Sequence, residues 1–524
     1  MSGARAQVTA GNIAARVTGL VRVVAVGGAL GTTYLGNTYQ TANLVSNLLF
    51  ELLAAGILSS VLVPPFVALL EDDRRGDAER LAGAVLGVAL AVLGAVTVAG
   101  LLARPWIMRA LTVAVSDDAV REAEVRLGGF LLWLFLPQVL FYAVSSVATA
   151  VLHGSRRFAA AAFAPVANNL VVIATMVAFR ALAGGDAGLD LPLSHRLVLA
   201  VGTTAGVVAM AAVPVVALRR AGIRLRPRWD PSHPGLRRLA RAGIWGVVYL
   251  TMTQLLLAVT LVLANRVEGG VVAYHIAFTT FLLPFAILAH PVFTTVYPNL
   301  AADAQACRWT GFAEALGRGA RSIAFLILPA AALMVALARP GLRLIEVGAL
   351  DDAGSSLVAR ALAAYALGLA GYAGLHLLTR ASYAAGDTRT PALVNVGVAA
   401  GGSLLMVTLF RLASGSGRMV AIGVAHSVAM VAGAVVLGAA VRRRVGRPWP
   451  VGATLARAVA GAVAAGLAAA TVADMVGSGS RLAAALAVGL GGTAGVGAYL
   501  LVAWVLRAPE LDLRRAPAVA EPAT

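Results

Sequence analysis

The sequence predicts an all-α, polytopic membrane protein. Of its 524 residues, 60% are hydrophobic and 13% are charged, and the mean hydropathy is +0.85. Soluble domains carry about 25% charged residues. Apolar stretches long enough to span a bilayer recur along the whole chain. We therefore expect about fourteen transmembrane helices, arranged as two pseudo-repeated six-helix halves plus two C-terminal helices.

The expected spans follow from runs of about 20 apolar residues. They are residues 10–31, 38–70, 81–103, 127–152, 160–183, 195–218, 239–264, 271–300, 319–338, 357–383, 390–410, 419–440, 453–473 and 482–506. The second and eighth spans are longer than a straight crossing requires. They contain Pro64-Pro65 and Pro284 with Pro291, so we expect them to be tilted, kinked or extended beyond the membrane.

Arginine placement predicts the orientation. All 42 basic residues are arginines, and with a cytoplasmic N-terminus most of them fall in cytoplasmic segments, above all in residues 219–241. The net charge of +18 therefore indicates positive-inside topology rather than nucleic-acid binding. We expect a multi-pass protein of the cytoplasmic membrane with both termini in the cytoplasm.

Two internal repeats predict the domain organisation. Leu58–Pro64 recurs as Phe293–Asn299, and Leu152–Arg157 recurs loosely as Ala385–Arg389, both at an offset of about 230 residues. Two parallel halves of this kind bind substrate between them. The expected parts are an N-terminal half (1–218), a basic cytoplasmic linker (219–238), a C-terminal half (239–440), two extra transmembrane helices (441–508) and a disordered tail (509–524).

Several kinds of chemistry are excluded. Without lysine, the chain has neither a P-loop lysine nor a Schiff-base lysine. A single cysteine, Cys307, excludes an intramolecular disulfide and a CxxC site, and the seven histidines include no HExxH motif. We expect no enzyme activity, no cofactor and no metal site.

Charged residues inside the apolar stretch 15–65 are the first candidate site. Arg16, Arg22 and Glu51 lie there, and a charge near the bilayer centre costs about 2.5–3.5 kcal/mol. Arg16 and Arg22 diverge by about 120° around a helix, so both could border a wide cavity and hold phosphate. The alternative is that they snorkel to the membrane surface.

Other polar residues complete the predicted site. Asn37 lies on nearly the same helical face as Glu51, which could be an ion-pair partner of Arg22, a proton or cation carrier, or a gate. Gln254 and His290 are further substrate-binding candidates, although a buried structural histidine is the alternative for His290.

Cytoplasmic loops supply candidate gate residues. Arg157, Asp387 and Arg389 could form ion pairs that break during alternating access. The alternative is that they lie in solvent-exposed turns and have no role in gating.

Motifs in the first 400 residues are similar to those of a known family. They are Arg16-Val17, Gly19-Leu20, Arg22, Asn47-Leu48-Leu49, Leu136-Pro137-Gln138, Asn168-Asn169, Leu283-Pro284-Phe285 and Asp387-Thr388-Arg389-Thr390-Pro391. Together they resemble the MurJ (MviN) lipid II flippases, of the multidrug, oligosaccharidyl-lipid and polysaccharide exporter superfamily, as in a divergent actinobacterial-type member. The chain departs from the family pattern at Asn37, usually Asp, at Phe50-Glu51, usually two arginines, and at Ala55, usually Glu.

The resemblance implies a flippase that moves lipid II, the undecaprenyl-diphosphate-linked precursor, outward by alternating access during peptidoglycan synthesis. Outward movement of a negative charge gains about 2.3 kcal/mol per 100 mV, so ATP is not required. Implied partners are a lipid-linked anionic glycan, membrane lipids, and cell-wall synthesis or division proteins. Alternatives are an exporter of another polyprenyl-linked glycan, a cation-coupled drug exporter, and a transport-inactive cell-wall assembly scaffold.

Overall fold

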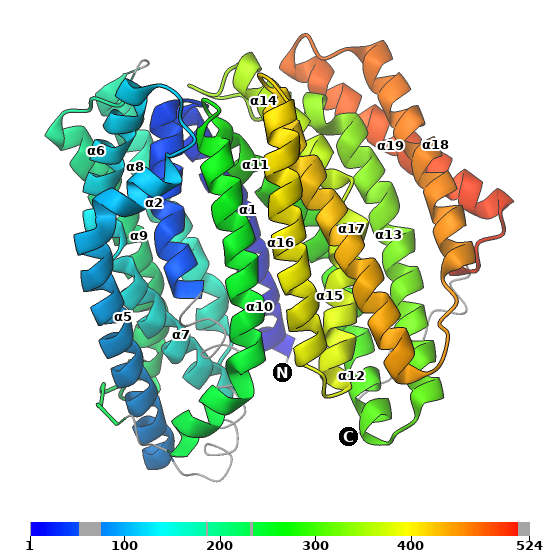
Figure 1. The fold of residues 1–524 in the computed structure, drawn as a ribbon, viewed down its shortest axis with the longest axis horizontal. Helices are drawn as coiled ribbons and strands as arrows, with labels where there is room; N and C mark the ends of the chain where they lie inside the picture. The colour runs from blue at the N-terminus through cyan, green and yellow to red at the C-terminus, as the bar shows by residue number, and fades with distance from the viewer. Residues whose placement is uncertain (1, 52–65, 67–74, 185–186, 231–233, 512–524) are drawn as a thin grey trace. The chain divides into compact units, whose positions relative to one another are not determined.

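A computed structural model of the chain describes residues 2–51, 66, 75–184, 187–230 and 234–511, and every regular element within these ranges is a helix (Figure 1). Twelve of these helices or helix runs are long and apolar enough to cross a membrane, or up to 13 if a bent pair is one span. The prediction of an all-α polytopic membrane protein is confirmed. The second expected span appears as the shorter helix α2, because the rest of that span lies outside the described residues.

The chain folds into two compact units, and the first comprises Met1–Ile276 with Val347–Gly354. Its helices are α1 (Ser2–Leu30), α2 (Tyr34–Phe50), α5 (Arg75–Leu111), α6 (Asp118–Phe135), α7 (Gln138–Gly154), α8 (Ala159–Ala183), α9 (Leu193–Arg220), α10 (Pro234–Asn265) and the start of α11 (Gly270–Pro284). α8 packs between α1 and α9, and α2 packs on α6. The expected boundary between two halves at 218 and 239 stays a prediction.

A tight turn sets the start of α2 against the end of α1. Gly31 ends α1 with a φ of +65°, a conformation that glycine adopts without strain. Thr33 then caps α2, since its hydroxyl accepts a hydrogen bond from the Gly36 N–H at 3.2 Å. The turn therefore fixes where α2 enters the bundle.

The basic segment after α9 is docked on α5. The Arg228 N–H donates to the Gly83 carbonyl at 2.8 Å, and the Arg224 N–H donates to Glu79 Oε1 at 2.9 Å. A side chain at Gly87 would collide with the Arg228 backbone, so glycine permits this close approach. The segment predicted as a linker thus has a fixed place in the first unit up to Asp230, and residues 231–233 lie outside the described part.

The second unit comprises Ala277–Glu346 and Ser355–Thr524. Besides the end of α11 it contains the π-helix η2 (Phe285–Ala289), α12 (His290–Gln305), α13 (Trp309–Arg343), most of α14 (Asp352–Ala366), α15 (Leu369–Ala384), α16 (Arg389–Leu412), α17 (Gly417–Val445), α18 (Gly452–Val476), α19 (Arg481–Val505) and η3 (Pro509–Leu511). α17 packs on both α15 and α16, and the C-terminal pair α18 and α19 packs on α13.

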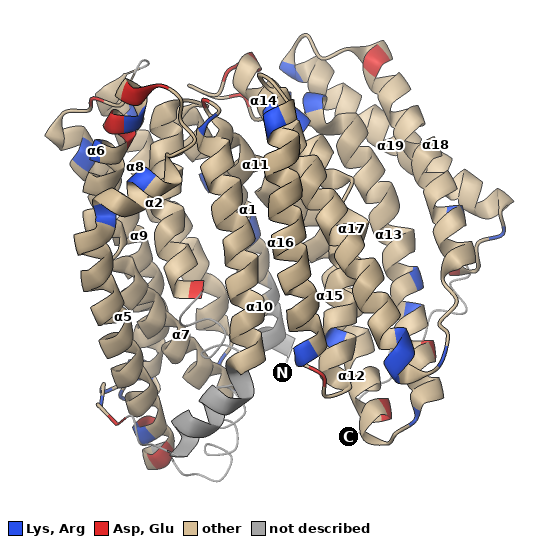
Figure 2. Cartoon of the chain, in the orientation of Figure 1, with Lys and Arg blue, Asp and Glu red and all other residues tan. Residues whose placement is uncertain are grey.

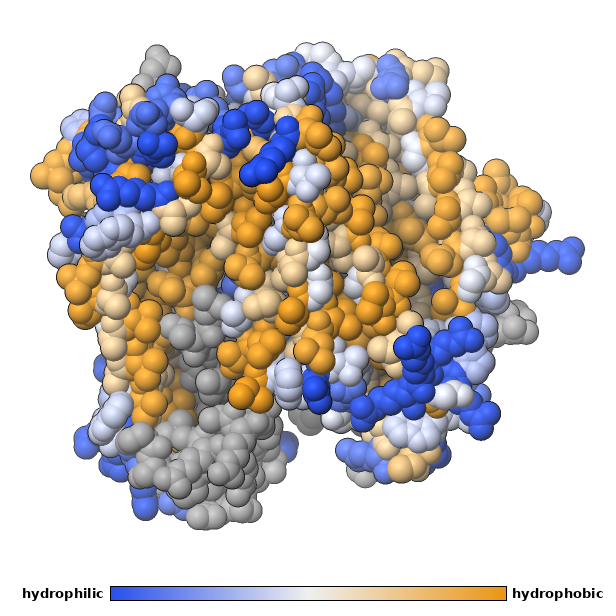
Figure 3. Space-filling view, in the orientation of Figure 1, coloured by the Kyte–Doolittle hydropathy of each residue, from blue (hydrophilic) through white to orange (hydrophobic). Residues whose placement is uncertain are grey.

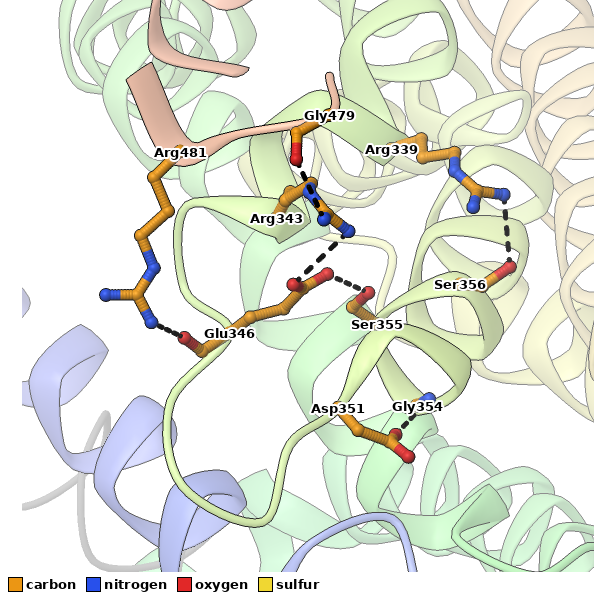
Figure 4. Close-up of polar contacts among 9 residues, drawn as sticks. All are labelled: Arg339, Arg343, Glu346, Asp351, Gly354, Ser355, Ser356, Gly479 and Arg481. Atoms are coloured by element: carbon orange, nitrogen blue, oxygen red, sulfur yellow. Dashed lines mark hydrogen bonds and ion pairs between the residues drawn. The ribbon is translucent and has the colours of Figure 1, made fainter. Parts of the chain in front are cut away.

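Polar contacts hold the α18–α19 turn to the segment after α13 (Figure 4). Arg343 Nη2 donates to the Gly479 carbonyl at 3.3 Å, and Arg343 also pairs with the Glu346 carboxylate at 3.5 Å. Glu346 accepts a hydrogen bond from Ser355, and its carbonyl accepts one from Arg481. These contacts fix one end of the two extra helices within the second unit.

The eighth expected span is continuous from Gly270 to Gln305 but changes its hydrogen bonding after Pro284, and its expected tilt or kink stays a prediction. α11 ends at Pro284 and a π-helix follows over Phe285–Ala289 before α12 begins. Proline lacks the N–H needed for the α-helical ladder, which explains the change of hydrogen bonding there. Pro64 and Pro65 lie outside the described residues. A bend of 48° between α14 and α15 was not predicted.

The ends of the helices carry most of the charge. In each unit, acidic and basic side chains gather near helix termini, and the middle parts of the helices are apolar (Figures 2 and 3). Part of the predicted disordered tail is ordered: Pro509–Leu511 forms a turn of 3-10 helix, and Glu510 accepts a hydrogen bond from Thr454 at 2.7 Å. Residues 512–524 lie outside the described part.

Candidate functional site

Arg22 is a half-buried cation near the middle of the apolar span Ala10–Leu30 of α1. Tyr39 on α2, Tyr142 on α7 and His275 on α11 lie within electrostatic range of its guanidinium. None of the three supplies a carboxylate. Within the described residues, Arg22 has no ion-pair partner. Side chains of three other helices therefore lie near the Arg22 charge, and none of them neutralises it.

Arg16 lies in a different environment from Arg22. It is exposed, nearer the start of α1, whereas Arg22 is half-buried. Between them, Thr18 accepts a hydrogen bond from Asn169 Nδ2 of α8 at 3.1 Å, which fixes this part of α1 against α8. The two arginines therefore differ in burial, and their place at the border of one wide cavity stays a prediction.

Glu51 ends α2 and is partly buried. No arginine among the described residues lies within ion-pair distance of it, so the pair with Arg22 considered from the sequence is not formed in this conformation. Its neighbour Phe50, which stands where MurJ proteins usually carry arginine, packs its ring 5.4 Å from that of Tyr142. The Phe50 ring thus contacts Tyr142, which is one of the residues near Arg22, at a position where the family usually has an arginine.

Asn37 is fully buried and holds two elements together. Its Nδ2 donates to the Val267 carbonyl at 2.8 Å, and its Oδ1 accepts the Val271 N–H at 2.9 Å. Both ends of the amide are used to fix α2 to the turn between α10 and α11. The structure gives Asn37 this structural role, and its predicted contact with substrate stays a prediction.

Gln254 and His290 belong to different units. Gln254 on α10 is partly buried in the first unit, and its Oε1 is a buried acceptor with no hydrogen-bond donor among the described residues. His290 begins α12 in the second unit, is exposed, and has its ring 6.4 Å from that of Phe293. The predicted substrate-binding set therefore has Arg16, Arg22, Asn37, Glu51 and Gln254 in one unit and His290 in the other.

The predicted gate residue Asp387 forms an ion pair that the sequence did not identify. Arg444 Nη1 at the end of α17 donates to Asp387 Oδ2 at 2.9 Å and its Nη2 donates to the Ala385 carbonyl at 3.1 Å. Asp387 Oδ1 accepts the Thr390 N–H at 3.0 Å at the start of α16. Burial by itself raises the pKa of the Asp387 carboxyl, but the hydrogen bonds from Thr390 and the charge of Arg444 outweigh it, so the pKa is lower than usual.

The other two gate candidates are exposed. Arg389 is the first residue of α16 in the second unit, and Arg157 follows the end of α7 in the first unit. A gate contact for either residue stays a prediction. Asp387 with Arg444 is one gate-loop ion pair that the structure contains.

Glu124 is a buried carboxyl that sequence reasoning missed. It is 0% exposed on α6, Thr38 donates to its Oε1 at 3.2 Å, and its Oε2 has no partner among the described residues. The sequence placed the fourth span at 127–152, which left Glu124 outside the membrane, but α6 begins at Asp118. Asp117 is the signal in the sequence that could have found Glu124. Asp is a favoured N-cap residue, so Asp117 marks the start of a helix that includes Glu124.

Comparisons with known proteins agree with this architecture. The family model "Lipid II flippase MurJ" matches residues 26–482. The probable lipid II flippase MurJ of Rhizobium meliloti (strain 1021) is 30% identical over 418 residues, covering 79% of this chain and 76% of the relative. That of Rhizobium tropici is 27% identical over 440 residues, covering 83% and 80%.

Two solved structures share the fold. A lipid II flippase MurJ in an inward closed conformation has a TM-score of 0.76 at 17% identity and covers 95% of this chain and 98% of its own. An inward-facing multidrug resistance MATE family transporter has a TM-score of 0.67 at 14% identity, covering 82% and 94%. Because the family model covers most of the sequence and the fold agrees, this multi-span membrane protein belongs to the lipid II flippase MurJ family.

Proposed function

We propose that this protein translocates lipid II, or a close polyprenyl-diphosphate glycan, across the cytoplasmic membrane by alternating access, without chemical change of the substrate. Family membership over residues 26–482 supports this function. The proposed orientation has both termini in the cytoplasm, because arginines then concentrate on the cytoplasmic side.

Arg22 is the observation that carries the proposal. A half-buried guanidinium without a carboxylate partner among the described residues is costly in a membrane. A diphosphate would supply the missing negative charge and accept paired N–H donors. The cation would then be stabilised when substrate is bound, which favours an anionic headgroup over a cationic drug.

The remaining predicted residues have supporting roles in this proposal. The unpaired Gln254 Oε1 can accept a hydrogen bond from a hydroxyl or amide of the headgroup. The exposed Arg16 attracts the diphosphate toward α1. Asp387 and Arg444, together with Arg157 and Arg389, belong to the gate loops, whose ion pairs would exchange as access alternates.

The test is exposure of the lipid II headgroup on the outer leaflet of cells depleted of the wild-type protein and complemented with variants. We expect Arg22→Ala to reduce exposure by about 10- to 100-fold, the equivalent of 1.5–3 kcal/mol for hydrogen bonds to a charged group. Arg22→Lys keeps the charge but loses the fork, so it should be impaired less. Arg220→Ala, at an exposed position in the last turn of α9, is the matched control.

Wild-type exposure with a well-inserted Arg22→Ala variant would reject the role of Arg22. Repeating the assay after collapse of the membrane potential tests the driving force. If the potential drives transport, headgroup exposure should fall when the potential is collapsed. If depletion leaves headgroup exposure unchanged but sensitises cells to cationic dyes, the protein is a drug exporter. If it changes only the location of cell-wall proteins, the protein is a scaffold.

A further inference from the structure

A groove of about 580 Å³ runs along the surface of the second unit between α16 and α17. Gly397 and Gly401 of α16 and Val428 and Val436 of α17 line it. A Cβ atom added at either glycine would have no atom within 4 Å in the described structure. The two glycines therefore leave an apolar groove that no described side chain of the protein fills.

A basic hollow follows this groove along α17. Arg442, Arg443 and Arg447 line a second depression of about 410 Å³. Arg443 lies seven residues after Val436, which places the two within about 20° of each other around the helix. Figure 3 shows the apolar surface over α16 and α17 giving way to hydrophilic side chains at this end, and Figure 2 shows basic residues there.

The positive charge of this hollow is not neutralised within the described structure. Arg444 is paired with Asp387 at 2.9 Å and does not line the hollow. Arg442, Arg443 and Arg447 are exposed, and no described acidic side chain lies within ion-pair distance of them. Three cations therefore remain available to an anion beside the groove.

We propose that this surface binds one anionic phospholipid, with its phosphate on Arg443 and Arg447 and one acyl chain in the groove along Gly397 and Gly401. The apolar α17 side from Val428 to Val436 is about 12 Å long, close to the roughly 15 Å of hydrocarbon in one leaflet. Arginine holds phosphate through paired N–H donors, and basic clusters at the ends of transmembrane helices attract anionic lipids.

A second copy of the chain fits the surface less well. Gly397 and Gly401 have the spacing that lets two membrane helices approach closely. Two copies inserted in the same direction and related by a two-fold axis would, however, place their Arg442–Arg447 clusters beside each other. Like charges repel there, whereas a phosphate complements them.

The experiment uses the full-length protein in nanodiscs that contain phosphatidylcholine and phosphatidylglycerol. Native mass spectrometry counts the phosphatidylglycerol molecules retained by each variant. Gly397→Leu with Gly401→Leu fills the groove, and Arg443→Gln with Arg447→Gln removes the charge. We expect each pair of changes to lower retention several-fold, whereas the control Arg220→Gln, an exposed arginine at the end of α9, leaves it unchanged.

Thermal unfolding of each variant shows whether its fold is intact, and Gly397→Ala provides a smaller filling change that favours the helix. Unchanged phosphatidylglycerol retention in folded variants of both pairs would overturn the proposal. Loss of a dimer mass with phosphatidylglycerol retained would assign the groove to a second copy. Loss of a co-purified polyprenyl lipid with phosphatidylglycerol retained would assign it to the tail of the transported lipid.

Discussion

The interiors of the two units are built from different side chains. In the first unit, buried polar groups join helices: Asn37 binds the α10–α11 turn, Thr41 bonds to Asn265 at 3.2 Å, and Tyr39 bonds to Thr203 at 2.8 Å. In the second unit, aromatic and histidine rings form the equivalent cluster. Directional hydrogen bonds penalise any other arrangement of the helices, whereas an apolar cluster can repack if its total volume is kept.

The ring cluster of the second unit adjoins its irregular helix. Phe285 belongs to the π-helix, and its ring lies 4.9 Å from Tyr372 and 5.3 Å from His376. Tyr365 and His426 are 5.0 Å apart in the same cluster. Ring packing beside a π-helix can adjust when the helix bends. We infer from this contrast that the first unit holds Arg22 in a fixed frame and the second unit is easier to repack.

The largest expected effect on stability is at Asn37. Asn37→Leu removes two hydrogen bonds and leaves the Val267 carbonyl and the Val271 N–H without their partner. An unsatisfied buried polar group costs about 1–3 kcal/mol, so we expect a loss of about 2–4 kcal/mol in the free energy of unfolding. Thermal unfolding in detergent measures it, with the exposed Asn12→Leu as control. Equal stability of the two variants would contradict a hydrogen-bonded frame.

A smaller effect is expected in the ring cluster. Phe281 is 0% exposed, and its ring lies 5.5 Å from Phe278 and 5.4 Å from Tyr372. Phe281→Leu keeps an apolar group but removes three carbon atoms, and because the neighbouring rings can repack into the space we expect a cost of about 1–2 kcal/mol. The same thermal unfolding assay compares it with Asn37→Leu. A loss larger than that of Asn37→Leu would reverse the comparison of the two units.

The sequence predicted the helices well and predicted few of the contacts between them. Apolar run length located the spans, and a charge inside an apolar run located Arg22, because both signals are local. The contact of Thr38 with Glu124 and the pair of Asp387 with Arg444 join residues 86 and 57 positions apart. Helix packing decides such contacts, and no local pattern encodes them. The span boundary at 127 also hid Glu124, since charged residues at a helix start look like a loop.

The smallest expected effect concerns the ion pair of the second unit. The side chain of Asp387 is 12% exposed and that of Arg444 is 49% exposed, so the pair is partly screened and Asp387→Asn should cost at most about 1 kcal/mol at neutral pH. The pKa of Asp387 is lowered in the folded protein. Its contribution is therefore complete above the unfolded pKa of about 3.9 and is lost as the pH falls through the folded pKa.

Thermal unfolding of the wild type and of Asp387→Asn across pH tests this expectation. The difference between them should be constant near neutral pH and should vanish only in acid. Arg444→Gln should lose a similar amount at neutral pH, because it removes the other half of the same pair. A difference that grows toward acid pH would mean that the carboxylate destabilises the fold. The pair would then be a poor candidate for a gate contact that must form in one state and break in another.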